Sequence, residues 1–184
     1  MAIIALGVTG HRYVAEMDQI KAGVESAIQR MLETFPGSNF RILSSLAEGA
    51  DRILAKRLLS IPNTSLWVPL PLPEEEYLKD FETSSSKQEF IHLLGKAERV
   101  IALPVTGKRE EAYLAAGKFI LDHSDLLMTI WDGKPGRGVA GTSAIIALAR
   151  KRGLPMAWIH AGNHRNPGQE KVTFEHLPPP GRKL

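Results

Sequence analysis

The alternation of short apolar runs with longer amphipathic segments constrains the fold of this chain more than any other feature. Each run is strand-length, and the segments between them repeat apolar residues at three- and four-residue steps, which is typical of helices. The runs cover residues 3–8, 40–44, 65–70, 100–105, 125–131 and 156–160. This pattern predicts an α/β class, a Rossmann-like doubly wound, mostly parallel sheet of about six strands with helices on both faces.

The expected helices complete this arrangement. They cover residues 14–35, about 48–60, 84–97, 110–123 and 142–152, with a short helical turn at 74–81. On these helices we expect Arg52 to face water and Ile91 to face inward. Residues 1–160 should form one nucleotide-binding domain, and residues 161–184 an irregular C-terminal tail in which 172–177 is a candidate edge strand.

Composition excludes several classes of protein. The 184 residues contain no cysteine, so a disulfide, a thiolate metal site and a cysteine nucleophile are ruled out. The motifs of P-loop ATPases and serine-hydrolase elbows are missing, and the six histidines show no metal-ligand spacing, so we expect no metal. A net charge of +3 is too mild to indicate nucleic acid. The first apolar run is too short for a signal peptide or membrane span, so a cytoplasmic location without membrane association is expected.

The turn after the fifth run is the strongest functional signal. The run ends in Asp132 and Gly133, and a glycine-rich loop with Gly138 and Gly141 leads to Thr142, where a helix begins. Unpaired N–H groups at a helix N-terminus form an anion site, and glycines let the backbone approach a ligand closely. We therefore predict phosphate binding here. The alternative is an ordinary strand–helix connection, with Thr142 as N-cap and Asp132 capping its own loop.

Two further turns follow strands and should lie at the same edge of the sheet. Gly10, His11 and Arg12 follow the first run, and Arg12 suits bidentate phosphate contact unless it is merely a solvated residue at a helix start. In the second turn, Ser44 and Ser45 can donate to phosphate or ribose, or only satisfy the turn, and Gly49 completes the motif. These candidates join the ligand-binding set.

Acidic and aromatic side chains near these turns have two interpretations each. Glu48 and Asp51 lie at the start of a helix, where they complement the dipole. They could also meet a ribose, a base or Arg12, or act as the acidic group of a glycosidase. Tyr77, Asp80 and Phe81 are a candidate flap over a base, or are packed at the sheet edge.

Three segments together resemble the SLOG superfamily: Gly7–Arg12, Ser45–Asp51, and Trp131–Gly133 with Gly138–Thr142. This Rossmann-like group includes the lysine decarboxylase-like, cytokinin-activating phosphoribohydrolases, the DNA-processing protein A family, molybdenum cofactor carriers and sensor domains. The phosphoribohydrolase signature ends in a catalytic glutamate, and the matching position here holds Ile145. The resemblance therefore implies nucleotide binding more strongly than hydrolysis.

The expected function is binding of a nucleotide or nucleotide-derived, phosphate-bearing small ligand, as a sensor or carrier. The first alternative is a hydrolase that cleaves a nucleotide N-glycosidic bond, with Glu48 or Asp51 as the acidic group. The second, implied by the DNA-processing relatives, is single-stranded DNA binding. A bound nucleotide is the only cofactor that we expect, and a homodimer formed through helices is compatible with the fold. The base and the number of phosphates are left open.

Overall fold

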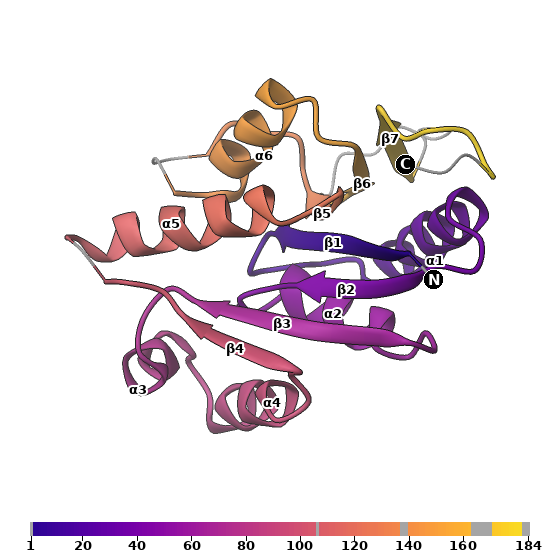
Figure 1. The fold of residues 1–184 in the computed structure, drawn as a ribbon. Helices are drawn as coiled ribbons and strands as arrows, with labels where there is room; N and C mark the ends of the chain where they lie inside the picture. Colours follow the sequence, from indigo (N-terminus) through magenta and orange to yellow (C-terminus); the bar gives the residue numbers. More distant parts are fainter. Residues whose placement is uncertain (1, 106, 137–139, 163–170, 182–184) are drawn as a thin grey trace.

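A seven-stranded sheet in the order β4-β3-β2-β1-β5-β6-β7 is the centre of the molecule (Figure 1). The computed structural model describes residues 2–105, 107–136, 140–162 and 171–181. The strands are β1 (Ile3–Gly10), β2 (Asn39–Leu43), β3 (Thr64–Leu70), β4 (Arg99–Ala102), β5 (Leu126–Trp131), β6 (Met156–His160) and β7 (Val172–Glu175). The first six pair in parallel and β7 pairs antiparallel with β6, which confirms the α/β class and the mostly parallel sheet.

Helices cover both faces of this sheet. They are α1 (Met17–Thr34), α2 (Ala50–Leu58), α3 (Glu74–Tyr77), the 3-10 turn η1 (Leu78–Asp80), α4 (Ser84–Leu94), α5 (Arg109–Asp122) and α6 (Thr142–Lys151). Figure 1 shows α5 and α6 on one face, while α1 and α2 lie on the other, where α2 is joined to α4 by ion pairs. The arrangement is doubly wound.

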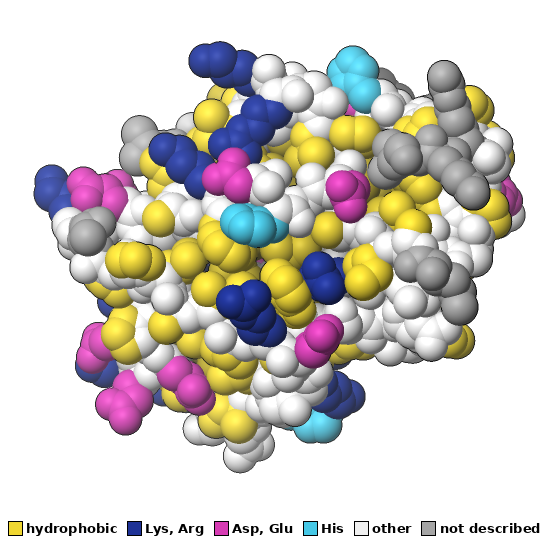
Figure 2. Space-filling view, in the orientation of Figure 1, with side chains coloured by type: hydrophobic (Ala, Val, Ile, Leu, Met, Phe, Trp, Pro, Cys, Tyr) yellow, Lys and Arg dark blue, Asp and Glu magenta, His cyan; other side chains and the backbone are white. Residues whose placement is uncertain are grey.

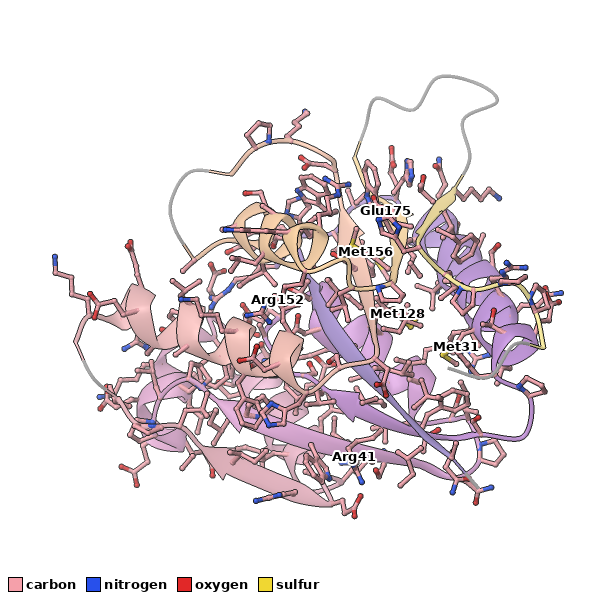
Figure 3. All side chains as sticks on the ribbon, turned by 45° about the horizontal axis from the view of Figure 1, so that its top comes forward. Met31, Arg41, Met128, Arg152, Met156 and Glu175 are labelled. Carbon is pink, nitrogen blue, oxygen red and sulfur yellow. The ribbon has the colours of Figure 1, made fainter. Side chains whose placement is uncertain are left out.

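Two hydrophobic cores occupy the two faces. Met31 of α1 and Met128 of β5 belong to the larger core, on the α1 and α2 side, and Met156 of β6 belongs to the smaller core, packed under α6 (Figure 3). Because β5 is covered on both faces, all six of its residues are buried. This double coverage explains why β5 is a continuous apolar run in the sequence rather than an alternating one.

The sheet changes its winding direction between β1 and β5. The chain proceeds from β1 to β2, β3 and β4 on one side, and then crosses back so that β5 and β6 pair on the other side of β1. In open α/β sheets the carboxyl ends of two such strands diverge and leave a crevice for ligands. The turns after β1, β2 and β5 all meet at this edge.

Several local expectations need correction. Arg52 does not face water, since its side chain is only 2% exposed, and Ile91 does not face inward, since it is 50% exposed. The first helix begins at Met17 rather than at residue 14, because Glu16 adopts a left-handed conformation with φ 57° that the helix cannot include.

The predicted tail contains one regular element. The candidate edge strand at 172–177 is confirmed as β7, which closes the sheet beyond β6. Among the described residues, no helix is both long and apolar enough to cross a bilayer.

Candidate ligand-binding site at the carboxyl edge of the sheet

A cavity of about 360 Å³ lies at the switch point, between the carboxyl end of β1 and the helices α5 and α6. Its volume is near the lower end of the range for small-molecule sites, about 300–1,000 Å³. Eight of the side chains or glycines predicted from sequence line it: Gly10, His11, Arg12, Ser45, Asp51, Tyr77, Gly141 and Thr142. Residues from three separate turns therefore share one cavity.

The N-terminus of α6 borders this cavity, and among the described residues no side chain caps it. Gly141 is the N-cap residue, so the expectation that Thr142 caps the helix is wrong; the Thr142 hydroxyl instead donates to the Gly10 carbonyl oxygen at 2.9 Å. Gly141 has φ −79°, which any residue can adopt, and a Cβ added there would meet no atom of the described residues within 4 Å. Neither backbone conformation nor packing among the described residues requires glycine. The first intrahelical hydrogen bond runs from the Ala144 N–H to the Gly141 carbonyl oxygen at 3.0 Å, so the N–H groups of Thr142 and Ser143 precede it.

The turn after β1 brings Arg12 to the cavity. Its Nη2 is 3.9 Å from Asp80 Oδ2, a long ion pair, because Asp80 is held more closely by Arg109. The Arg12 guanidinium also lies 5.8 Å from the centre of the Tyr113 ring. Arg12 precedes α1 by several residues, so it is not a residue of the helix start. Among the described residues, Asp80 is the one carboxylate within ion-pairing distance of its guanidinium.

His11 and Gly10 hold the β1 turn against the β5 end. His11 Nε2 lies 3.0 Å from Asp132 Oδ1 and within 3.2 Å of the Asp132 backbone nitrogen. Partial burial opposes ionisation of Asp132, but the N–H of Lys134 and the contact with His11 lower its pKa. The Lys134 N–H bond, 3.0 Å long, is the self-capping turn considered above. A Cβ at Gly10 would overlap Ala50, so glycine is required there for close approach.

The turn after β2 is occupied by its own hydrogen bonds. Ser44 donates to Asp51 Oδ2 at 3.0 Å, and Ser45 donates to the Pro69 carbonyl at 2.8 Å. Gly49 has φ 79°, and a Cβ there would overlap the carbonyl oxygens of His11 and Arg12. The structure thus gives Ser44 and Gly49 supporting positions; of these three residues, only Ser45 lines the cavity.

The two predicted carboxylates, Glu48 and Asp51, point to different places in the structure. Asp51 is buried and lines the cavity; burial raises its pKa to about 7, against the hydrogen bonds from Ser44 and Ala47 and the charges of Arg12 and Arg52. Glu48 turns away and accepts a hydrogen bond from the Ser86 hydroxyl. Only Asp51 can therefore act on a ligand in this cavity.

Arg52, which we expected to be solvated, is buried and stabilises the turn after β2. Its Nε donates to the Leu46 carbonyl at 2.9 Å, and its Nη1 donates to the Ser86 carbonyl at 2.9 Å and lies 3.2 Å from Glu89. Its guanidinium packs 4.4 Å from the Phe81 ring centre. These contacts fix Leu46 at φ 56°, a conformation that is uncommon for leucine.

The helical turn at 74–80 is packed against the protein core and does not form a flap over the cavity. Tyr77 and Phe81 are each 1% exposed, and their ring centres are 5.0 Å apart in an edge-to-face pair beside Phe90. Burial, and then the charge of Asp51, raises the pKa of the Tyr77 phenol, which is one wall of the cavity. Phe81 and Asp80 do not line the cavity, so the packed arrangement is the one observed.

Sequence reasoning missed the wall that α5 supplies. Tyr113, Ala116, Gly117 and Ile120 line the cavity together with Ile145 of α6. A Cβ at Gly117 would overlap Ile145, so this glycine permits close packing of α5 and α6. The alanine-rich face of α5 was the available signal, because small residues leave room beside a sheet edge.

The remaining predicted residues lie elsewhere. Gly133, with φ 80°, packs against the Trp158 ring and, like Asp132, is outside the lining of the cavity. Gly138 lies outside the described residues. On the molecular face shown in Figure 2, acidic and basic side chains are interspersed and do not form one basic stripe.

Comparison with known proteins gives no relative from which a function of the site could be inferred. No protein-family model matches the chain, and no curated protein matches it. The fold and cavity define a Rossmann-like α/β protein with a small crevice at the switch point of its sheet.

Proposed function

We propose that the chain binds a nucleotide or a nucleotide-derived small ligand in the switch-point cavity, as a sensor or carrier. One observation carries the proposal: the uncapped N-terminus of α6 at Gly141 and the loosely paired Arg12 border the same cavity. Helix N-terminal N–H groups and a guanidinium are both ligands for phosphate.

We infer the position of the phosphate from a comparison of the hydrogen-bond donors at the starts of α6 and α2. At α6, no described residue comes within 4 Å of a Cβ added to Gly141, although its backbone angles do not require glycine. Among the described residues, space therefore remains beside the N–H groups of Thr142 and Ser143. At α2 the side chains of Ser44 and Asp51 bond to each other, and a carboxylate there repels an anion whenever it is ionised. We therefore place the phosphate at α6 and Arg12.

The rest of the cavity suits the nucleoside part. Tyr113, Ala116 and Ile120 offer an apolar wall for a base, while Asp51 and Ser45 offer polar groups for a ribose or for base edges. The resemblance of the three turns to the SLOG superfamily points to the same class of ligand.

A second candidate function, N-glycosidic hydrolysis, is favoured by one feature. Asp51 is a buried carboxyl group in the cavity with a pKa of about 7, a value suited to proton transfer near neutral pH. Against it, Ile145 occupies the position of the glutamate in the phosphoribohydrolase signature and is 4% exposed. We therefore rank binding above hydrolysis.

The test uses Gly141, because a substitution there separates folding from binding. Gly141→Asp supplies a favourable N-cap to α6 and keeps the fold, but its carboxylate occupies and repels the phosphate position. Isothermal titration with AMP, GMP, CMP and UMP should show binding of at least one nucleotide to the wild type. Gly141→Asp should raise the Kd of that nucleotide about 100-fold, which corresponds to about 2.8 kcal/mol of binding free energy.

Gly141→Ser is the matched control, since serine also caps the helix but brings no charge. The proposal fails if none of the four nucleotides binds, or if Gly141→Asp binds as the wild type does. Chromatography of the same mixtures tests the second candidate: free base released by the wild type and not by Asp51→Asn would establish an enzyme in place of a sensor.

A further inference from the structure

A second cavity, of about 540 Å³, adjoins the first across Arg12. Arg12 lines both cavities, but the second lies on the opposite side of the β1 turn, against α1, α2 and α4. Its lining includes Tyr13, Gly49, Arg52 and Lys56. The loop that carries Arg12 therefore separates two hollows of comparable size at the same edge of the sheet.

The second cavity is lined by more cations than anions. Arg12, Arg52 and Lys56 face a single carboxylate in its lining, Glu89, which lies 3.2 Å from Arg52 and 2.6 Å from Lys56. Arg52 is 2% exposed, and its Nη2 has no hydrogen-bond acceptor within the described chain. The lining therefore carries an excess of positive charge, which favours an anionic occupant.

The rim of this cavity carries apolar surface of the kind on which a base can stack. Tyr13 is 74% exposed although its hydroxyl donates to Glu82 at 2.7 Å, a bond that fixes the direction of the ring. Met17, which is 39% exposed, lies beside it in the lining. Exposed aromatic rings beside cationic grooves bind nucleobases by stacking.

We infer that the ligand is a dinucleotide, with one nucleotide unit in each cavity and the linking phosphate group at Arg12. This inference rests on the proposed function, and it names the ligand class of that site. A mononucleotide in the first cavity would leave the second cavity with three cations and one carboxylate, Glu89, in its lining. Arg12 has five N–H donors and lies between the two hollows, so it can contact phosphates on both sides.

The experiment compares the four mononucleotides with their 5′-phosphorylated dinucleotides, such as pApA, by isothermal titration. We expect the best dinucleotide to bind the wild type at least about 10-fold more tightly than the matching mononucleotide. Lys56→Glu should reduce this ratio to below about 3-fold while the Kd of the mononucleotide stays unchanged. Lys56 is half-exposed, with 51% of its side chain accessible, so the variant should fold.

Two further variants keep the result interpretable. Lys151→Glu makes the same change of charge on an exposed lysine at the far end of α6 and should leave both Kd values unchanged. Ala15→Trp fills the second cavity without changing charge and should also remove the advantage of the dinucleotide.

Equal affinity for mononucleotide and dinucleotide would overturn the inference and leave the proposed function standing. An equal loss of both ligands in Lys56→Glu would do the same. A ten-nucleotide single-stranded DNA that binds a further 10-fold more tightly than the dinucleotide would overturn the inference, because it would show that the ligand is a nucleic acid polymer. Absence of binding by every nucleotide would overturn the proposed function and this inference together.

Discussion

The turns that follow β2 and β5 lie at the same edge of the sheet and both contain glycine before a helix, yet they are used differently. After β2, Ser44, Ser45 and Glu48 all bond to other groups of the protein. After β5, Gly141 is the N-cap of α6, and among the described residues no side chain caps the helix and no atom lies within 4 Å of a Cβ added to Gly141.

The difference shows that a glycine-rich strand–helix turn is not by itself a ligand site. In the first turn Gly49 allows two backbone segments to come into contact, and in the second Gly141 leaves room that no described residue fills. The hydrogen bonds around each turn, rather than its sequence, distinguish the supporting turn after β2 from the turn after β5, where we propose that the phosphate binds.

The largest expected effect would come from exchanging the two glycines for alanine in turn. Gly49→Ala requires a left-handed alanine whose Cβ overlaps two carbonyl oxygens, so we expect a loss of about 4 kcal/mol or more in the free energy of unfolding. Gly141→Ala should cost less than about 1 kcal/mol, because its backbone angles suit alanine. Urea unfolding of both variants measures the contrast, and similar losses would show that the two turns do not differ in this way.

Removal of the buried cation beneath the β2 turn should have the next largest effect. Arg52→Met leaves the Leu46 and Ser86 carbonyls without their Arg52 donor and leaves Glu89 with Lys56 alone, which should lower the free energy of unfolding by about 3 kcal/mol. Lys56→Met removes the other, half-exposed partner of Glu89 and should cost below about 1 kcal/mol. Equal losses in urea unfolding would mean that burial of Arg52 adds nothing.

The smallest of these effects concerns pH. The pKa of Asp51 rises from 3.8 to about 7 in the folded state, so the folded protein keeps a proton that the unfolded chain releases between pH 4 and 7. The unfolding free energy that this group contributes is fully present below pH 4 and is lost as the pH rises through 7. At about 1.4 kcal/mol per pKa unit, roughly 2.5 kcal/mol of it is lost between pH 5 and pH 8. Asp51→Asn should lack this loss. Urea unfolding of both proteins at pH 5, 6, 7 and 8 tests it, and a difference that is constant with pH would refute it.

Much of the fold could be predicted because its causes are local. The continuous apolar run of β5 indicated a strand covered on both faces, and the order of runs and helices indicated a parallel sheet. Of the candidate site, Arg12, Ser45, Asp51, Gly141 and Thr142 were predictable, because parallel strands place their following turns on one edge.

The rest depends on contacts between distant segments. Arg52 is buried and Glu48 is drawn away from Asp51 because α4 brings Ser86 and Glu89 over the start of α2, some 35 residues further along the chain. Nothing in the local pattern around residue 52 distinguishes it from a solvated arginine. Tyr113 lines the cavity only because α5 returns across the sheet.

The close fit of Gly49 against the backbone of Arg12 has a mechanical consequence. The His11 carbonyl accepts a hydrogen bond from the Ala50 N–H at 2.9 Å, and no side chain separates the two segments. If the backbone of Arg12 shifts when a ligand binds, the first turn of α2 has to move with it, because the two backbones are in direct contact. An event in front of the sheet is thereby transmitted to the helical layer behind it.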